Sequence, residues 1–311
     1  MEPLLIRLFG KLSIQRHAQE LPSFKARKVQ ELLCYLVLHR NRPHGREALS
    51  DVLWGEATAT QAKKGFRQSL WLLQSALEES NSAESCAPTL LVDSEWVQFN
   101  CETNHWIDVA EFERVFGLVR DLPGTALDQG AVLELRAAVE LYRADLLEGW
   151  YQDWCLFERE RLQSIYLGMI DRLMDYSEQC GEYDAGVDYG MTILRYDAAR
   201  EHTHRRLMRL HHWAGNRTAA LRQFEQCTAA LRDELGAQPS RRTLELRDRI
   251  LADDLSPLPS AVAEPLEQAV GAPEEVLGYL RSLQQLLSAA QSRLQSSIDA
   301  AEATLRRSRR A

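Results

Sequence analysis

The sequence of 311 residues lacks any apolar run close to the roughly 20 residues that a membrane-spanning helix needs. Its first residues hold only a brief apolar patch without a small-residue cleavage site, so we expect no signal peptide. Its six cysteines form no Cys-x-x-Cys pair, and a chain of this length needs no disulfide bonds to fold. These absences predict a cytoplasmic protein with reduced cysteines and no membrane contact.

Motifs of catalysis and cofactor binding are also lacking. The sequence contains no G-x-x-x-x-G-K-[ST], G-x-G-x-x-G, H-E-x-x-H or G-x-S-x-G. Four histidines cluster near one another, but on one helix only His204 and His211 share a face, whereas His202 and His212 point elsewhere. We interpret this cluster as a polar helix surface. The carboxylates lie among arginines without forming a catalytic pair, so we expect no enzyme activity, no metal and no cofactor.

Lysine is absent after Lys64, and the charge of the chain is uneven as a result. Residues 1–100 carry 12 basic and 11 acidic side chains, whereas the other 211 residues carry 25 basic and 34 acidic ones. A near-neutral head on an acidic body fits a DNA-binding domain joined to a protein-interaction domain. It equally fits two domains without a role in nucleic-acid binding.

The head, residues 1–100, has the pattern of strands, three helices and a final hairpin. This order is that of a winged helix, whose third helix lies in the major groove of DNA. The first hairpin is expected at residues 4–16, the first helix within residues 25–43 where Pro43 stops it, the other helices at 45–56 and 59–79, and the last hairpin, the wing, at 90–100.

The third of these helices is expected to carry the function. One face holds the apolar residues Phe66, Leu70, Leu73 and Leu77, at the spacing of a helix that packs on a core. The other faces carry cations and amides suited to phosphates and base edges, and these are Gln61, Lys63, Lys64, Arg67 and Gln68. A solvated helix face is the alternative interpretation. Trp71 either packs against the core or a partner, or wedges against DNA.

The body, residues 101–252, is predicted to be helical nearly throughout. Asp108 is expected to cap its first helix with Glu111 as the partner of a capping box, and long helices are expected at 128–147 and 153–180. A repeat of 34 residues aligns Gly181 with Gly215, each in a turn between two helices. This period predicts tetratricopeptide-like hairpins with a concave surface for peptides, proteins or small ligands.

The tail is expected to consist of a linker at residues 253–272 and a long helix at 273–311. The linker is rich in proline. The helix carries a heptad seam that predicts a coiled coil and hence a homo-oligomer. The predicted oligomerisation residues are Leu280, Leu283, Leu287 and Leu294. An amphipathic helix that packs back on the body is the alternative.

Several segments resemble the Streptomyces antibiotic regulatory protein (SARP) family. LFGKLSI, ARKVQELLCYLVLHRNRPHGREALSDVLWGE and QAKKGFRQSLWLLQSAL resemble its OmpR-type winged helix, and Arg67 matches the arginine of its recognition helix. TNHWIDVAEFE, DWCLFERERL and residues 197–240 resemble the bacterial transcriptional activation domain that follows. The chain departs from the family where Trp71-Leu72-Leu73-Gln74 replaces Ser-Arg-Leu-Arg, and in its acidic wing turn at residues 93–95.

The sequence therefore predicts a mainly α fold with a winged helix-turn-helix head (α+β), a tetratricopeptide-like all-α body and a C-terminal long helix. The resemblance implies a cytoplasmic regulator that binds double-stranded promoter DNA and contacts RNA polymerase. The alternative is an interaction scaffold that has kept the winged-helix fold but no longer reads DNA. A regulator that senses an effector on its repeat surface is compatible with either hypothesis.

Overall fold

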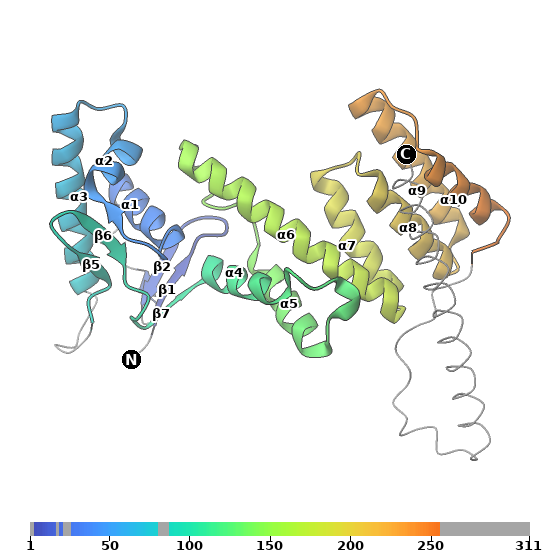
Figure 1. Cartoon of the computed structure of the whole chain (residues 1–311), viewed down its shortest axis with the longest axis horizontal. Coiled ribbons are helices and arrows are strands. Elements are labelled where there is room, and N and C mark those ends of the chain that lie inside the picture. Colours follow the sequence, from blue (N-terminus) through green and yellow to red (C-terminus); the bar gives the residue numbers. More distant parts are fainter. Residues whose placement is uncertain (1–2, 17–18, 21–25, 80–86, 256–311) are drawn as a thin grey trace, which may run out of the picture. The chain divides into compact units, whose positions relative to one another are not determined.

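The computed structural model describes residues 3–16, 19–20, 26–79 and 87–255 (Figure 1). All of them belong to one compact unit, Met1–Leu258. The predicted oligomerisation residues of the tail, Leu280, Leu283, Leu287 and Leu294, lie outside the described residues.

The head has the predicted strands, three helices and closing hairpin. Its helices are α1 (Arg27–Leu38), α2 (Arg46–Trp54) and α3 (Ala59–Glu79). One sheet has the order β3-β2-β1-β7, with β1 at Leu4–Arg7, β2 at Ser13–Arg16, β3 at Gln19–Glu20 and β7 at His105–Ile107. The second sheet has the order β4-β6-β5, with β4 at His44–Gly45, β5 at Leu90–Val92 and β6 at Trp96–Phe99.

Backbone pairing crosses the predicted boundary at residue 100. Strand β7 pairs in parallel with β1, with Trp106 opposite Leu5, and the amide of Leu147 donates to the carbonyl of Leu8 at 2.8 Å. One apolar core continues from Leu4 in the head to residues of the body. The head is therefore held to the first part of the body by a sheet and a shared core.

Asp108 has a different role from the predicted capping box, which is wrong. Helix α4 (Asp108–Val119) begins after Ile107, and the buried Asp108 carboxylate accepts hydrogen bonds from the amides of Leu8 and Phe9 at 2.8 and 2.9 Å. Glu111 instead pairs with Arg114 at 2.8 Å. Asp108 thus ties the end of β1 to the start of the body, because a buried carboxylate requires such donors.

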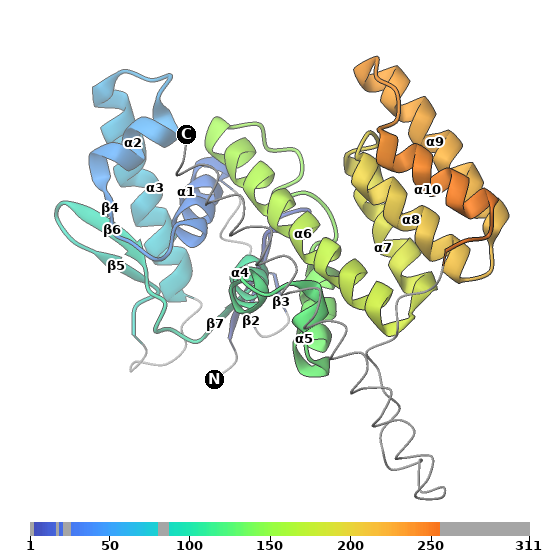
Figure 2. The same cartoon turned by 45° about the vertical axis from the view of Figure 1, so that its right-hand side comes forward.

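The body consists of helices that pack on their neighbours in chain order (Figure 2). After α4 these are α5 (Gln129–Leu141), α6 (Asp153–Cys180), α7 (Tyr183–Tyr196), α8 (Glu201–Trp213), α9 (Arg217–Leu235) and α10 (Arg241–Leu251). The helix predicted to reach residue 147 ends at Leu141. Leu146 pairs with Phe9 instead, in an isolated bridge that a helix could not make.

The predicted helical hairpins are present. Helices α6 and α7 are joined at Gly181 and α8 and α9 at Gly215, and these glycines have φ angles of 76° and 77°. The amide after each glycine closes the turn, because Glu182 donates to the Ser177 carbonyl at 2.9 Å and Asn216 to the His211 carbonyl at 2.8 Å. The left-handed glycine that the repeat requires is therefore found in both copies.

Candidate nucleic-acid interface

Helix α3 begins with a capping box. The amide of Gln61 donates to the Thr58 hydroxyl at 3.5 Å, and the amide of Thr58 donates to the Gln61 side-chain oxygen at 3.4 Å. The sequence assigned Gln61 to DNA contact alone. In the structure its side chain also stabilises the first turn, so only its free amide nitrogen remains for a ligand.

The inner face of α3 is buried as its periodicity predicts. Phe66, Leu70, Leu73 and Leu77 are each at most 3% exposed and belong to the core shared with α1 and α2. Trp54 at the end of α2 meets the Phe66 ring edge-on, with 6.1 Å between the ring centroids. This packing fixes the rotation of the helix and thereby determines which residues face outward.

The outward face carries the predicted DNA-binding residues. Gln61, Lys63, Lys64, Arg67 and Gln68 are all exposed. Lys64, Arg67, Gln68 and Trp71 follow one another at helical spacing, and we call these four residues the outer stripe of α3. Trp71 is 64% exposed, so its expected packing against the core is wrong, whereas contact with a partner or with DNA stays a prediction.

The cations of α3 are not equivalent. Lys63 forms an ion pair with Glu47 at the start of α2, with 2.8 Å between Nζ and Oε1. The hydrogen bond from Lys63 lowers the pKa of Glu47, which in turn raises the pKa of the lysine. Within the described part of the chain, Lys64 and Arg67 have no ion pair, and Arg67 donates Nε to the Lys63 carbonyl at 3.1 Å. Lys64 and Arg67 are therefore the free cations of this surface.

The wing ends in an exposed acidic turn. Asp93 Oδ1 accepts hydrogen bonds from the Glu95 amide at 3.1 Å and the Ser94 hydroxyl at 3.0 Å, and these bonds lower the pKa of the Asp93 carboxyl. The turn is therefore charged at neutral pH and repels phosphate, as expected from the sequence. Arg46 lies beside it and donates to the Ser94 carbonyl at 3.4 Å.

Comparison with known proteins identifies the body. Residues 107–251 match the family described as "Bacterial transcriptional activator domain". The match covers slightly less than half of the chain. We call residues 107–251 the activator domain from here on, and this match together with the winged-helix head confirms the predicted resemblance to SARP-like regulators.

Two known proteins are similar to this chain over most of its length. The regulatory protein AfsR of Streptomyces coelicolor is 26% identical over 239 residues, which are 75% of this chain and 23% of AfsR. The chain thus spans about a quarter of AfsR. EmbR of Mycobacterium tuberculosis, solved with a low affinity phosphopeptide, matches with a TM-score of 0.68 and 20% identity over 82% of this chain and 67% of EmbR. This second likeness concerns the fold alone.

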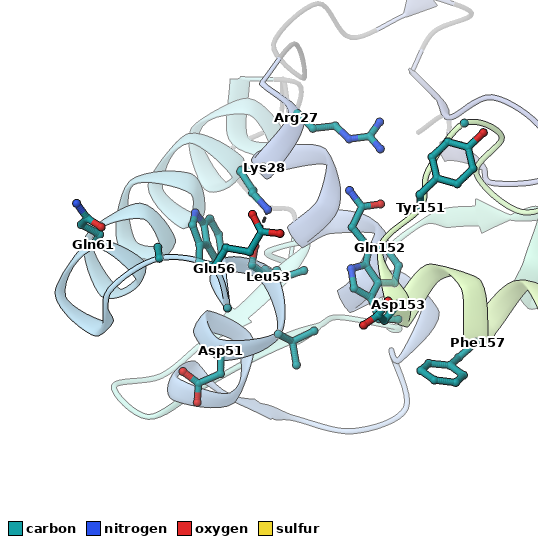
Figure 3. Close-up of a pocket in the computed structure, with 16 residues that line it drawn as sticks. Arg27, Lys28, Asp51, Leu53, Glu56, Gln61, Tyr151, Gln152, Asp153 and Phe157 are labelled. Atoms are coloured by element: carbon teal, nitrogen blue, oxygen red, sulfur yellow. Dashed lines mark hydrogen bonds between the residues drawn. The ribbon is translucent and has the colours of Figure 1, made fainter.

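A cleft of about 1180 Å³ lies between the head and the activator domain (Figure 3). Asp51 and Glu56 line it on the head side, and Tyr151, Asp153 and Phe157 line it at the start of α6. Tyr151 and Phe157 are 76% and 71% exposed. None of the three carboxylates has an ion pair within the described residues. The cleft therefore combines exposed aromatic rings and these carboxylates with the cations Arg27 and Lys28, which pair with Glu31. No sequence pattern had singled it out.

The polar centre of the activator domain is structural. Arg206 is 2% exposed, and its guanidinium lies 3.0 Å from Asp171, 2.5 Å from Asp175 and 3.0 Å from Glu178. His204 is also buried, so its interpretation as helix surface is wrong. It contacts the Ala198 carbonyl and the Gln223 side chain at 2.8 and 2.7 Å.

Neither arrangement offers metal-binding geometry. In the described part of the chain, no group of three or more histidine, cysteine or carboxylate side chains is placed to hold a metal ion. No described helix has the length and apolar character needed to cross a membrane.

Proposed function

We propose that this chain is a transcriptional regulator that binds double-stranded promoter DNA in the cytoplasm through α3. The observation that carries the proposal is the outer stripe, which places Lys64, Arg67 and Gln68 on one exposed line. The sequence of α3 contains no Asp or Glu before Glu78. Cations on this line would neutralise phosphates, and the arginine and glutamine reach base edges in a major groove.

The architecture supports this use of the helix. AfsR, a protein named as regulatory, is similar to this chain over 75% of the chain's residues, and the chain combines a winged helix with an activator domain. The buried face of α3 holds the helix against α1 and α2, so the outer stripe is presented on a supported element. The acidic wing turn is expected to stay away from the phosphates, which leaves α3 to provide most of the affinity.

The alternative is a scaffold that has kept the fold without reading DNA. The acidic wing and the exposed Trp71 favour it, since both suit a protein partner as well as a nucleic acid. Under this alternative the head docks a protein, and no DNA sequence is preferred.

Selection of random duplex DNA by the full chain over a salt series separates the two functions. We expect one sequence to be enriched, and we expect the enrichment to disappear when Lys63, Lys64 and Arg67 are all replaced by alanine. A matched control replaces Arg232, Arg241 and Arg247 of the activator domain with alanine. Both triple variants then have the same net charge. No enrichment by the wild-type chain at the lowest salt would exclude the DNA-binding proposal.

We also propose that the activator domain contacts RNA polymerase, as the resemblance implies, and that the cleft is part of this contact. Aromatic side chains with large exposed area are typical anchors of protein interfaces. Replacing Tyr151 and Phe157 with alanine is expected to leave DNA affinity unchanged and to lower transcription from the selected site in a purified system. The proposal for the cleft fails if transcription by the double variant equals that of the wild type.

A homo-oligomer formed by the tail remains a prediction of the sequence. Replacing Leu280, Leu283, Leu287 and Leu294 with alanine in the full chain should reduce the mass measured by light scattering to that of a monomer. An unchanged mass would exclude the coiled-coil proposal.

A further inference from the structure

Trp71 occupies the position on α3 where the outer stripe changes from polar to apolar. It follows Arg67 by four residues and Gln68 by three, so its side chain neighbours both on the helix surface. The preceding residue, Leu70, is 3% exposed and belongs to the core, whereas Trp71 is 64% exposed. The indole therefore lies on the exposed face of α3, on the same stripe as Lys64 and Arg67.

Such an exposure has a physical disadvantage that a ligand would remove. A tryptophan side chain removes a large apolar area from water when it is covered, and it also carries one N–H donor. Among the described residues, no ring contact, hydrogen bond or cation–π contact involves Trp71. Its environment on the helix is basic, because Lys64 and Arg67 lie on the same stripe and the first acidic residue is Glu78.

The charge around Trp71 favours nucleic acid as the occupant. In a major groove the thymine C5-methyl is the apolar group that a side chain can contact, and the groove edges carry acceptors for an N–H donor. We propose that Trp71 is a specificity residue that packs against a thymine methyl group, next to the base pair contacted by Arg67 or Gln68. This inference rests on the proposed DNA-binding function and assigns the chemical feature that the helix reads.

The test removes single methyl groups from the DNA. In the sequence selected by the full chain, each thymine is replaced in turn by deoxyuridine, and affinity is measured by fluorescence anisotropy for the wild type and for Trp71→Ala. Burial of one methyl-sized group corresponds to about a 4-fold change in affinity. We expect the wild type to lose about this factor at one or two thymines. Trp71→Ala should bind more weakly and be insensitive to deoxyuridine at those same positions.

Two variants serve as controls. Leu72→Ala removes a neighbouring side chain, 36% exposed, that lies off the outer stripe, and it should keep the full response to deoxyuridine. Trp71→Phe keeps an apolar ring and should keep part of the response. Because Trp71 is 64% exposed and has no ring contact or hydrogen bond among the described residues, thermal unfolding of Trp71→Ala should be close to that of the wild type.

Several outcomes would overturn the inference. One is a Trp71→Ala variant that binds like the wild type, and another is a variant that is weaker but still fully sensitive at every thymine. A third is unchanged DNA binding with lost transcription, which would assign Trp71 to a protein partner. Failure of the wild-type chain to select any DNA is a different result, because it removes the proposed function before Trp71 is tested.

Discussion

The three cations of α3 should contribute unequally to the salt dependence of DNA binding. Lys64 and Arg67 have no ion pair among the described residues, whereas Lys63 is held 2.8 Å from Glu47. Each lysine or arginine that neutralises a phosphate adds about 0.9 to the slope of log affinity against log salt. We therefore expect Lys64→Ala and Arg67→Ala to reduce the slope by about 0.9 each.

The expected size follows from the range of salt. Between 50 and 200 mM salt, a slope of 0.9 corresponds to about a 3.5-fold change in affinity, and two such contacts correspond to about 12-fold. Lys63→Ala should have a smaller effect, because this lysine must leave Glu47 before it can neutralise a phosphate. Glu47→Gln should do the opposite and raise affinity, since it frees Lys63 and removes a negative charge near the DNA.

Anisotropy titrations of a labelled selected fragment, repeated over a potassium chloride series, provide the slopes. Arg241→Ala is a suitable control, because Arg241 is a cation of α10 in the activator domain and lies outside the proposed interface. If Lys64→Ala and Arg67→Ala bind the fragment with the slope of the wild type, these two cations do not neutralise phosphates. If Lys63→Ala causes the largest change of the three, its ion pair with Glu47 does not limit its contact with DNA.

Two further predictions concern the stability of the activator domain. Arg206→Met should lower the free energy of unfolding, measured in urea, by about 3–5 kcal/mol, because three carboxylates lose their buried partner. The control Arg241→Ala should change this free energy little, because the Arg241 side chain is 91% exposed. Burial lowers the pKa of His204, so the unfolded chain binds a proton there more readily. Stability is then full above pH 6.5 and falls as the pH drops below it. The stability of His204→Gln should fall less between pH 6.5 and 5 than that of the wild type. If both proteins have the same dependence of stability on pH, His204 is not the cause of the fall.

The elements with a clear helical period were predictable from the sequence. The apolar spacing of Phe66, Leu70 and Leu73 gave the buried side of α3 and hence the exposure of its cations. The repeat of 34 residues located both glycine turns, because such a turn needs a residue with a positive φ angle, which glycine adopts without steric cost. Local periodicity therefore accounts for most of the helices and for the exposure of the candidate interface.

Contacts between distant segments were not predictable in this way. The pairing of β7 with β1 and the bridge from Leu146 to Phe9 join residues that are about 100 or more positions apart. The role of Asp108 depends on the same packing, since its donors come from the end of β1. No local pattern indicates such partners, and the sequence alone therefore predicts a helix up to residue 147 and a helix cap at Asp108.

The candidate interface also combines features that local periodicity predicts with features that depend on the packing of distant segments. Periodicity placed Lys63 on an exposed face, but its ion pair with Glu47 arises from the packing of α2 on α3. Trp71 had two interpretations in the sequence, and only the rotation of α3 against its neighbours leaves the indole outside the core. The cleft at the start of α6 likewise depends on how the head meets the activator domain.

A photochemical crosslink shows whether the outer stripe of α3 faces DNA in the bound complex. A photoreactive benzoylphenylalanine is placed at Gln68 on the stripe or, as a control, at the exposed Met191 of α7. With the full chain bound to its selected fragment, irradiation should link the protein to DNA from position 68 and not from position 191. If the bound protein forms no crosslink from position 68, the outer stripe does not face the DNA.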